Sequence, residues 1–353
     1  VSQESILHAL VVFYLNNLEK MNMDVPKKNK PTRNLALELV RVTEAGALGA
    51  GRFMGRGEKE EADAAAVDAM RLILKTIDMD GIIITGEGEK DEAPMLYNGE
   101  RVGNGEYPDV DVAVDPIDGT RPLAFGRLNA IATVAVAPRG TMFDPGPLVY
   151  MDKIVVGPAA KGKIDINAPV VDNLNAVAEA RGKHISDVTA VVLDRPRHAK
   201  LIEEIRKAGA RLRQIPDGDV AAALMTCLPD TGIDILFGIG GTPEGVLAAC
   251  ALQAMGGDIQ GKLYAGDSQT LALGKTAGYD FDQVLTMTDL VASDDVFFVA
   301  TGITDGELLK GVKYFSNSAR TESLVVRGLT GTVRWITATH HWDKLHGISS
   351  IKY

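Results

Sequence analysis

The chain has 353 residues, of which 46% are hydrophobic and 24% are charged. This composition is typical of a globular protein with one large or two ordinary domains. The formal net charge of −10 argues against a nucleic-acid-binding surface, because no basic stripe is available to neutralise phosphates. No apolar run reaches transmembrane length, and the short apolar segment at residues 6–15 lacks the basic region and cleavage site of a signal peptide. We therefore expect no nucleic-acid partner, no membrane association and a cytoplasmic protein.

The composition also changes along the chain. Residues 26–31 are rich in proline and lysine, as in a linker, so residues 1–33 are predicted to be a poorly ordered N-terminal extension. Gly- and Asp-rich loops begin near residue 160, which predicts a boundary between domains at 34–160 and 161–353. The two cysteines, Cys227 and Cys250, lie in apolar helical patterns, which indicates buried free thiols and a reducing compartment.

Two helices are predicted at the start of the folded part. Apolar side chains recur at helical spacing over residues 34–53 and again over residues 58–77, with a Gly-Arg-Gly break between the two helices. In the second helix Lys59 and Asp63 lie one turn apart, in the less favourable order for an ion pair and with the lysine at the positive end of the helix dipole. Helix stability therefore does not explain Lys59, although a solvated charged face remains the alternative.

A buried strand is predicted over residues 81–85, and it ends in the acidic loop Gly86-Glu87-Gly88. Glycine on both sides lets the backbone approach a ligand closely. Glu87 is thus a candidate metal ligand, and a solvated loop acid is the open alternative.

The next strand alternates aspartate and valine over residues 109–114 and leads into Asp115-Pro116-Ile117-Asp118-Gly119-Thr120. The alternation predicts one apolar and one acidic face, and the proline and glycine predict a turn. Such a turn presents two carboxylates and a hydroxyl at the end of a rigid element, and hard divalent cations prefer such oxygen ligands. The alternative is an ordinary turn with solvated acids.

The second half of the chain is predicted to be an α/β layer. After another core strand at residues 129–137, strands at 190–193, 211–215 and 233–237 are each followed by a loop and a helix. Ligands lie outside the carboxyl ends of strands in such sheets, so the three loops are expected to meet at one cleft. Two tail strands are predicted at 323–327 and 332–337, followed by histidines that we expect to be exposed or at an interface.

The three loops carry charged residues that have ordinary explanations when taken singly. Arg195 and Arg197 are explained as exposed cations after a strand, Asp217 and Asp219 as turn and cap residues, and Glu244 as a first-turn acid that complements the helix dipole. Their occurrence together, with glycines, at three consecutive strand ends is less easily explained by chance than any one of them alone.

The candidate ligands point to one chemistry. Oxygen ligands without cysteine or histidine suit magnesium or manganese, and such ions can clamp a phosphate and activate water. Arginine side chains are suited to a second anionic group. No Walker loop and no complete dinucleotide fingerprint occur in the sequence. Metal-assisted hydrolysis of a phosphate ester is therefore the favoured interpretation.

The motif at residues 115–120 resembles the signature of the lithium-sensitive, metal-dependent phosphatases. The surrounding strings resemble the bacterial class II (GlpX-type) fructose-1,6-bisphosphatases; they lie at residues 55–63, 86–97, 194–198, 216–219 and 238–245. The resemblance covers about residues 34–344 in order, and it departs from many relatives at Arg121-Pro122, where they carry a second threonine.

This resemblance implies an α/β (α+β), two-domain sugar-phosphatase fold with stacked α-β-α-β-α layers. It implies hydrolysis of the 1-phosphate of fructose 1,6-bisphosphate in gluconeogenesis, by an enzyme with two or more Mn²⁺ or Mg²⁺ ions. The metal-binding part would be the first domain and the sugar-phosphate-binding part the second. By analogy the chain would form a homo-oligomer, either a dimer or a tetramer. The alternatives are a dual enzyme that also hydrolyses sedoheptulose 1,7-bisphosphate, an inositol-type phosphatase, and a non-catalytic sugar-phosphate sensor.

The resemblance also implies roles for single residues. Asp63 and Glu87 would hold one metal ion, and Asp115, Asp118 and Glu244 a second. Thr120 would orient or help activate the attacking water, and Lys59 would assist beside the metal and phosphate cluster. The implied substrate contacts are Asp118, Gly119, Thr120, Tyr150, Arg195, Pro196, Arg197, Asp217, Gly218, Asp219 and Gly241.

Overall fold

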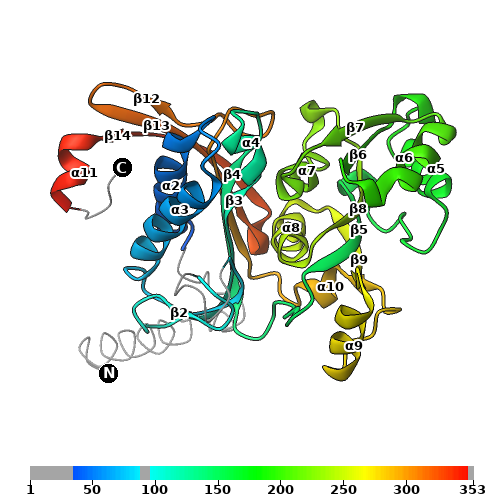
Figure 1. The fold of residues 1–353 in the computed structure, drawn as a ribbon, viewed down its shortest axis with the longest axis horizontal. Coiled ribbons are helices and arrows are strands. Elements are labelled where there is room, and N and C mark those ends of the chain that lie inside the picture. Colours follow the sequence, from blue (N-terminus) through cyan, green and yellow to red (C-terminus); the bar gives the residue numbers. More distant parts are fainter. Residues whose placement is uncertain (1–34, 88–95, 349–353) are drawn as a thin grey trace, which may run out of the picture. The chain divides into compact units, whose positions relative to one another are not determined.

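The computed structural model describes residues 35–87 and 96–348, so the predicted extension at residues 1–33 lies outside the described residues. The chain divides into two compact units, Val1–Leu35 and Ala36–Tyr353, and the fold described here is that of the second unit. Its helices and sheets stack as α-β-α-β-α layers, which confirms the predicted fold class (Figure 1).

The first sheet has the strand order β12-β13-β11-β4-β3-β1-β2, with β14 paired to β13. Helices α2 (Ala36–Ala50) and α3 (Lys59–Leu74) pack on one face of this sheet. The strands are β1 (Asp80–Thr85), β2 (Arg101–Val102), β3 (Asp109–Asp118), β4 (Ile131–Pro138), β11 (Phe297–Gly302), β12 (Lys313–Tyr314), β13 (Ser318–Arg327) and β14 (Thr332–His341).

The second sheet has the strand order β10-β9-β5-β8-β6-β7. Strands β6, β7 and β8 run parallel, as the three strand–loop–helix units predict, whereas β5 pairs antiparallel with β8 and β9. The strands are β5 (Tyr150–Val156), β6 (Thr189–Leu193), β7 (Arg211–Ile215), β8 (Ile235–Gly241), β9 (Asp258–Tyr264) and β10 (Leu285–Thr286).

The helices of the second half cover both faces of this sheet. Side chains from α5 and α6 form a core with Ile154, Val192 and Phe237 on the outer face. Helices α7 and α8 lie on the inner face.

The α-helices that follow α3 in the chain are α4 (Thr120–Ala124), α5 (Val170–Ala180), α6 (Ala199–Ala208), α7 (Asp219–Met225), α8 (Thr242–Met255), α9 (Ser268–Thr276), α10 (Met287–Leu290) and α11 (Trp342–Ile348).

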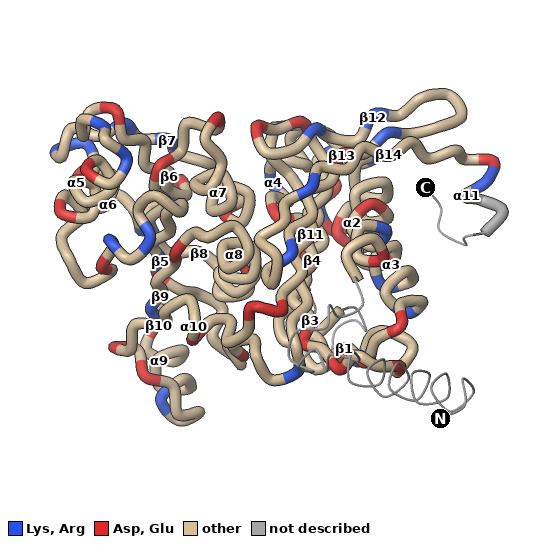
Figure 2. Tube along the Cα trace, turned by 180° about the vertical axis from the view of Figure 1, so that it is seen from behind, with Lys and Arg blue, Asp and Glu red and all other residues tan. Residues whose placement is uncertain are grey.

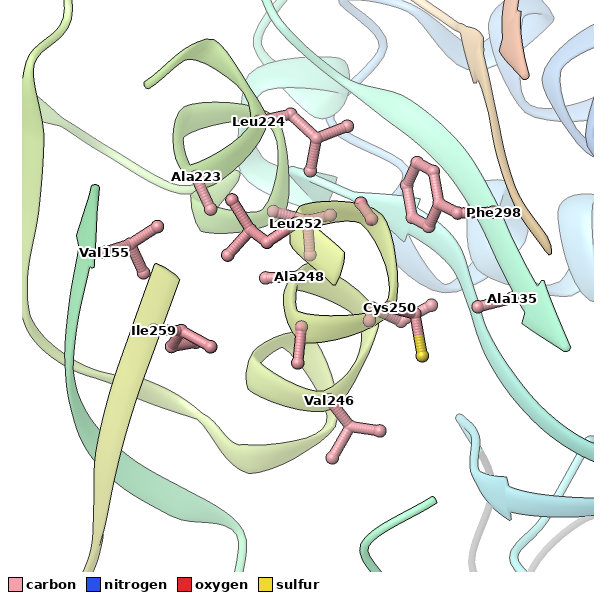
Figure 3. Close-up of a cluster of buried hydrophobic side chains, with 14 of the residues drawn as sticks. Ala135, Val155, Ala223, Leu224, Val246, Ala248, Cys250, Leu252, Ile259 and Phe298 are labelled. Carbon is pink, nitrogen blue, oxygen red and sulfur yellow. The ribbon is translucent and has the colours of Figure 1, made fainter. Parts of the chain in front are cut away.

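Helix α8 lies between the two sheets. Figure 3 shows Phe298 and Ala135 of the first sheet on one side of it and Val155 and Ile259 of the second sheet on the other. The helix is apolar around most of its circumference, as a helix must be when it is covered on two sides. Cys250 lies buried in this layer and Cys227 is half-buried nearby; both are free thiols, as predicted.

The acidic strand differs from its prediction. β3 runs through Asp118, with a shift in its pairing to β4 between Asp115 and Asp118, so the chain turns only at Gly119. Beyond the exposed Asp109, most of its acidic face is covered, because helices pack on both faces of the first sheet. Asp111 is buried and its Oδ2 accepts hydrogen bonds from the Thr141 and Met142 amides at 2.9 and 3.1 Å. These bonds give Asp111, which had no predicted role, a structural one.

Two further predictions were wrong in detail. The Gly- and Asp-rich region after residue 160 contains α5, whose Leu174, Val177 and Ala178 form the buried face. The glycine segment 238–241 is not a loop but the end of β8, where it pairs with β5 from Lys153↔Gly238 to Tyr150↔Gly241. Glycines fit there because the strand is packed closely against neighbouring side chains.

The predicted boundary near residue 160 falls just after β5, but each of the two sheets contains strands from both sides of this point. β5 precedes the boundary but belongs to the second sheet, and β11 to β14 follow it but return to the first sheet. The division into domains at residues 34–160 and 161–353 stays a prediction.

In the described part of the chain, no helix is long and apolar enough to cross a membrane. Figure 2 shows that acidic and basic positions are interspersed over the described elements.

The position of α8 predicts a large cost for removing its side chains. Replacing Leu252, which is fully buried, with alanine should lower the free energy of unfolding by about 2–5 kcal/mol through lost burial and the cavity left behind. Leu273→Ala on α9 is the matched control, since that side chain is 51% exposed and should change stability by less than about 0.5 kcal/mol. Urea unfolding of both variants measures this, and equal effects would contradict the burial of α8.

Candidate active site

The loops after β6 and β7 meet the end of β8, so the three predicted segments come together as expected. Arg195 donates from Nη1 to the Pro216 carbonyl at 2.5 Å and from Nη2 to Asp217 Oδ1 at 3.4 Å. Arg197 donates from Nε and Nη2 to the Ile239 carbonyl of β8 at 3.2 and 2.7 Å. The two guanidinium groups therefore tie the loop after β6 to the loop after β7 and to the end of β8.

The end of β3 delivers residues from the first sheet to the same region. Gly119 has φ of 99°, a conformation that glycine adopts without strain. Thr120 follows at the start of α4, and its hydroxyl donates to the Ile117 carbonyl at 3.2 Å and lies 3.4 Å from Asp63 Oδ1 on α3. Asp118 is buried, and its Oδ2 accepts from the Ala221 amide of α7 at 3.0 Å. This hydrogen bond joins the first sheet to the second half of the chain.

Acidic side chains from both halves are close enough to shift each other's titration. Burial and the charge of Glu87 raise the pKa of Asp63 to about 7. Burial and the charge of Asp219 raise the pKa of Glu244 to about 7. We call this group the carboxylate cluster; it comprises Asp63, Glu87, Asp115, Asp118, Asp217, Asp219 and Glu244.

The two carboxylates of β3 lie in the middle of the cluster. Burial raises the pKa of Asp115 well above its usual value, and the charges of Asp118 and Glu87 raise it further. Burial also raises the pKa of Asp118 strongly, with a second contribution from Asp219. Glu87 itself is exposed, so the cluster extends from the interior to the surface. The predicted metal ligands are thus neighbours, although they come from α3, the loop after β1, β3 and α8.

The remaining predicted residues border this cluster. Tyr150 is exposed at the start of β5, and the Arg197 guanidinium lies 5.3 Å from the centre of its ring. Lys59 lies with its ammonium 5.9 Å from the centre of the Phe125 ring, and its charge acts against the raised pKa of Asp63. Pro196 starts a short 3₁₀ turn after Arg195.

Glycines let the backbone come close to the acids. A Cβ on Gly241 would lie 1.7 Å from Glu244 Oε2, so the Glu244 side chain folds back over a position that only glycine can occupy. Gly218 has φ of 87° immediately before α7, and a Cβ there would lie 3.8 Å from Asp118 Oδ2.

Two residues at the site were missed by the sequence reasoning. Lys153 on β5 is buried, and its Nζ lies 2.7 Å from Asp219 Oδ2 and donates to the Gly241 carbonyl at 2.9 Å. The available signal was a lysine at an inward position of the strand, on the same face as Met151 and Val155. His198, which appeared only within a motif, accepts at Nε2 from the Ile239 amide at 2.8 Å and has Nδ1 2.7 Å from the Leu193 carbonyl. These bonds fix the neutral ring as a support for the loop that carries Arg197.

The cluster fits divalent cations by its donor set. Its side chains offer only carboxylate oxygens, apart from the nearby Thr120 hydroxyl, and Glu244 Oε2 is buried without a hydrogen-bond partner. Cations would also relieve the repulsion that raises these pKa values. Across residues 35–87 and 96–348, however, no three histidine, cysteine, aspartate or glutamate side chains are grouped so that they could hold one ion. The cluster is therefore an electrostatic neighbourhood rather than a closed ligand shell.

Comparison with known proteins agrees with the motifs. The chain matches the family model for "Bacterial fructose-1,6-bisphosphatase, glpX-encoded" over residues 33–340. It is 48% identical over 325 residues to fructose-1,6-bisphosphatase 1 class 2 of Escherichia coli strain K12, covering 88% of this chain and 96% of that protein. Fructose-1,6-bisphosphatase class 2 of Shigella flexneri matches to the same extent. Among solved structures, the extragenic suppressor protein SuhB of Bartonella henselae is 14% identical over 55% of this chain and 71% of its own, with a TM-score of 0.29 that is too low to support an argument.

The raised pKa values predict how the metal-free protein responds to pH. In the folded protein the pKa values of Asp63 and Glu244 are raised to about 7, from 3.8 and 4.5 in the unfolded chain, so the folded state binds more protons between these limits. By linkage, the free energy of unfolding should fall as the pH rises from about 4 to about 7, and this loss should be complete above pH 7.

Urea unfolding of chelator-treated protein at several pH values measures this trend. In Asp63→Asn the fall should be smaller, because one of the groups that takes up protons is gone. A free energy of unfolding that rises between pH 5 and 7, or an equal fall in the variant, would contradict the raised pKa of Asp63.

Proposed function

Because the chain belongs to the bacterial glpX-encoded fructose-1,6-bisphosphatase family, we propose that its carboxylate cluster is the centre at which fructose 1,6-bisphosphate is hydrolysed. The activity of the chain is hydrolysis to fructose 6-phosphate and inorganic phosphate, a step of gluconeogenesis. The observation that carries the placement is the meeting of acids from the first sheet with an arginine-bearing loop of the second half.

The acids would hold the metal ions. Asp63 and Glu87 would bind one ion, and Asp115, Asp118 and Glu244 another, with manganese or magnesium as the ions that suit these ligands. Since no three such side chains of residues 35–87 and 96–348 are already grouped for an ion, these ligands would move closer together when the ion binds. Bound ions of this kind lower the pKa of water and neutralise charge on the transferred phosphate. The orphaned Glu244 Oε2 and the mutual repulsion of the carboxylates support this assignment.

The Thr120 hydroxyl would orient the attacking water. It lies between the Ile117 carbonyl and Asp63, which accept from it at 3.2 and 3.4 Å, so it can accept a hydrogen bond from water and be held in place. The water oxygen forms a bond to the 1-phosphorus while the bond from phosphorus to the sugar oxygen breaks, and the sugar oxygen takes up a proton. Lys59, on the same helix as Asp63, would place positive charge near the phosphate.

The residues of the second half would bind the sugar and its second phosphate. Arg195 and Arg197 are fixed by backbone carbonyls and so present guanidinium groups in defined positions. The other proposed contacts are Gly119, Tyr150, Pro196, Asp217, Gly218, Asp219 and Gly241, with Asp118 shared between substrate and metal. The division into a metal-binding part and a sugar-binding part follows the two groups of contacts.

We also propose a cytoplasmic homo-oligomer, either a dimer or a tetramer, by analogy with the family. Size-exclusion chromatography with light scattering tests the oligomeric state, and a monomer at micromolar concentration would contradict it.

A phosphate-release assay tests the function. Purified protein with Mn²⁺ or Mg²⁺ should release phosphate from fructose 1,6-bisphosphate, and excess chelator should abolish the release. Sedoheptulose 1,7-bisphosphate and inositol 1-phosphate in the same assay separate the alternatives, since the arginine loop favours a sugar bisphosphate over a monophosphate. No release from fructose 1,6-bisphosphate with either ion would refute the proposal.

Removing the Thr120 hydroxyl should impair turnover more than binding. In Thr120→Ala we expect kcat to fall by about 10²–10⁴-fold while KM changes little, because a correctly placed proton acceptor or donor contributes about that much. Thr120→Ser keeps the hydroxyl and should retain most of the activity. Steady-state kinetics of both variants measures this, and unchanged kcat in the alanine variant would remove Thr120 from the mechanism.

A further inference from the structure

Lys153 is a buried cation in the centre of the second sheet. Its side chain is 3% exposed, its Nζ is 2.7 Å from Asp219 Oδ2, and it donates to the Gly241 carbonyl at 2.9 Å. It points to the inner face of β5, as Met151 and Val155 do, where the neighbouring positions pack against α8. A buried ammonium is costly unless it is paired and hydrogen-bonded, so its partners define what it does there.

Those partners belong to two different elements. Asp219 is the first residue of α7, and Gly241 is the last residue of β8, immediately before α8. Lys153 lies on a third element, β5, which pairs along its length with β8. One ammonium therefore contacts the start of α7 and the end of β8 at the same time.

The packing leaves little freedom for either partner. A Cβ on Gly240 would lie 2.1 Å from Asp219 Oδ2 and 3.0 Å from Lys153 Cε, so the ion pair lies directly on the backbone of β8. The next residue, Gly241, lies under the Glu244 carboxylate. Lys153, Asp219 and Glu244 are thus stacked over two consecutive glycines.

The ion pair between Lys153 and Asp219 also affects the electrostatic environment of the neighbouring acids. The negative charge of Asp219 acts on Asp118, Asp217 and Glu244, and the charge of Lys153 opposes it at Glu244. Arg195 faces Asp217 from the other side, and Arg121 contributes there as well. Without Lys153, the Asp219 carboxylate would remain buried among like charges, and no other cation of the described residues forms an ion pair with it.

We propose that Lys153 is a positioning residue that holds the Asp219 carboxylate and the Gly241 carbonyl in register for the sugar phosphate. The inference rests on the proposed function, since Asp219 and Gly241 are substrate contacts only in that function. Lys153 itself does not touch the substrate; it acts through these two groups.

Lys153→Met tests the proposal, because methionine keeps much of the apolar stem and removes the charge. The probe is fructose 6-phosphate, whose binding to chelator-treated protein is measured by calorimetry well below the melting temperature. We expect its affinity to fall at least about ten-fold, because the buried carboxylate loses its charged partner. With Mn²⁺ and fructose 1,6-bisphosphate, KM should rise by a similar factor and kcat should fall less.

Lys183→Met is the matched control. Lys183 also pairs with a buried carboxylate, that of Asp234, at 2.7 Å, although Asp234 has a second cation partner in Arg181 at 2.9 Å. This pair lies at the opposite end of β8 from the candidate site. The Lys183→Met variant should have a lower melting temperature than the wild-type protein, and its affinity for fructose 6-phosphate should change by no more than about two-fold. If Lys153→Met folds and behaves like this control, Lys153 is merely structural and the proposal is wrong.

The double variant Lys153→Met with Asp219→Asn keeps the test open if the single variant does not fold. It removes both buried charges, so it should melt at a higher temperature than Lys153→Met. Its loss of affinity for fructose 6-phosphate should be smaller than the product of the losses in the two single variants. If Lys153→Met does not fold, the double variant is compared with Asp219→Asn alone, and its affinity should be at most about three-fold lower than in that variant. If the double variant loses affinity by the full product of the two single losses, or by more than about three-fold beyond Asp219→Asn, Lys153 acts independently of Asp219 and the proposal is wrong.

The two proposals fail in different ways. Wild-type protein that neither hydrolyses fructose 1,6-bisphosphate nor binds fructose 6-phosphate contradicts the proposed function. Active wild-type protein with an unaffected Lys153→Met contradicts only the role of Lys153.

Discussion

Repulsion among buried carboxylates is the constraint on which the site depends. Asp115 and Asp118 lie within reach of acids from the loop after β1, from α7 and from α8, and burial raises the cost of every charge among them. The protein offsets part of this cost with its own groups: the Ala221 amide at Asp118, the Ile117 amide at Asp115 and the Lys153 ammonium at Asp219. The remaining excess of negative charge is what makes the site suitable for divalent cations.

The fold keeps this unfavourable arrangement in place. Asp118 ends a central strand of the first sheet, and its hydrogen-bond donor Ala221 lies in the first turn of α7 in the second half, so this bond joins the two parts at the site. Below this point α8 is packed between both sheets, and burial of its side chains stabilises the junction. Because the acids lie on elements fixed by that core, they cannot separate to relieve their repulsion.

The sequence predicted the local elements and the family well, but not the environment of single residues. The parallel strands β6 to β8 and helix α6 follow from apolar periodicity and from Gly and Pro at their ends, which are local signals. Burial of Asp111, pairing of the glycine segment 238–241 and the role of Lys153 depend on which element covers a strand face, and no local pattern encodes that. The proposed metal ligands could be named from the sequence because they lie in long motifs; the periodicity of the strands and helices does not show that their side chains are close together in space.

Under the proposed function, Arg195 and Arg197 would meet an anionic substrate with side chains that are already held in place. Both are bonded to backbone carbonyls, those of Pro216 and Ile239, so little side-chain freedom would remain to be lost if a phosphate bound there. A guanidinium has five N–H donors, and bonds to carbonyls leave others for the ligand. His198 fixes the same loop through Leu193 and Ile239, which means that the backbone carrying Arg197 is held on both sides. If divalent cations were held by the acids, positive charge would lie at two places, the bound ions and the arginines, and a molecule with phosphates at both ends would match that pattern better than one with a single phosphate.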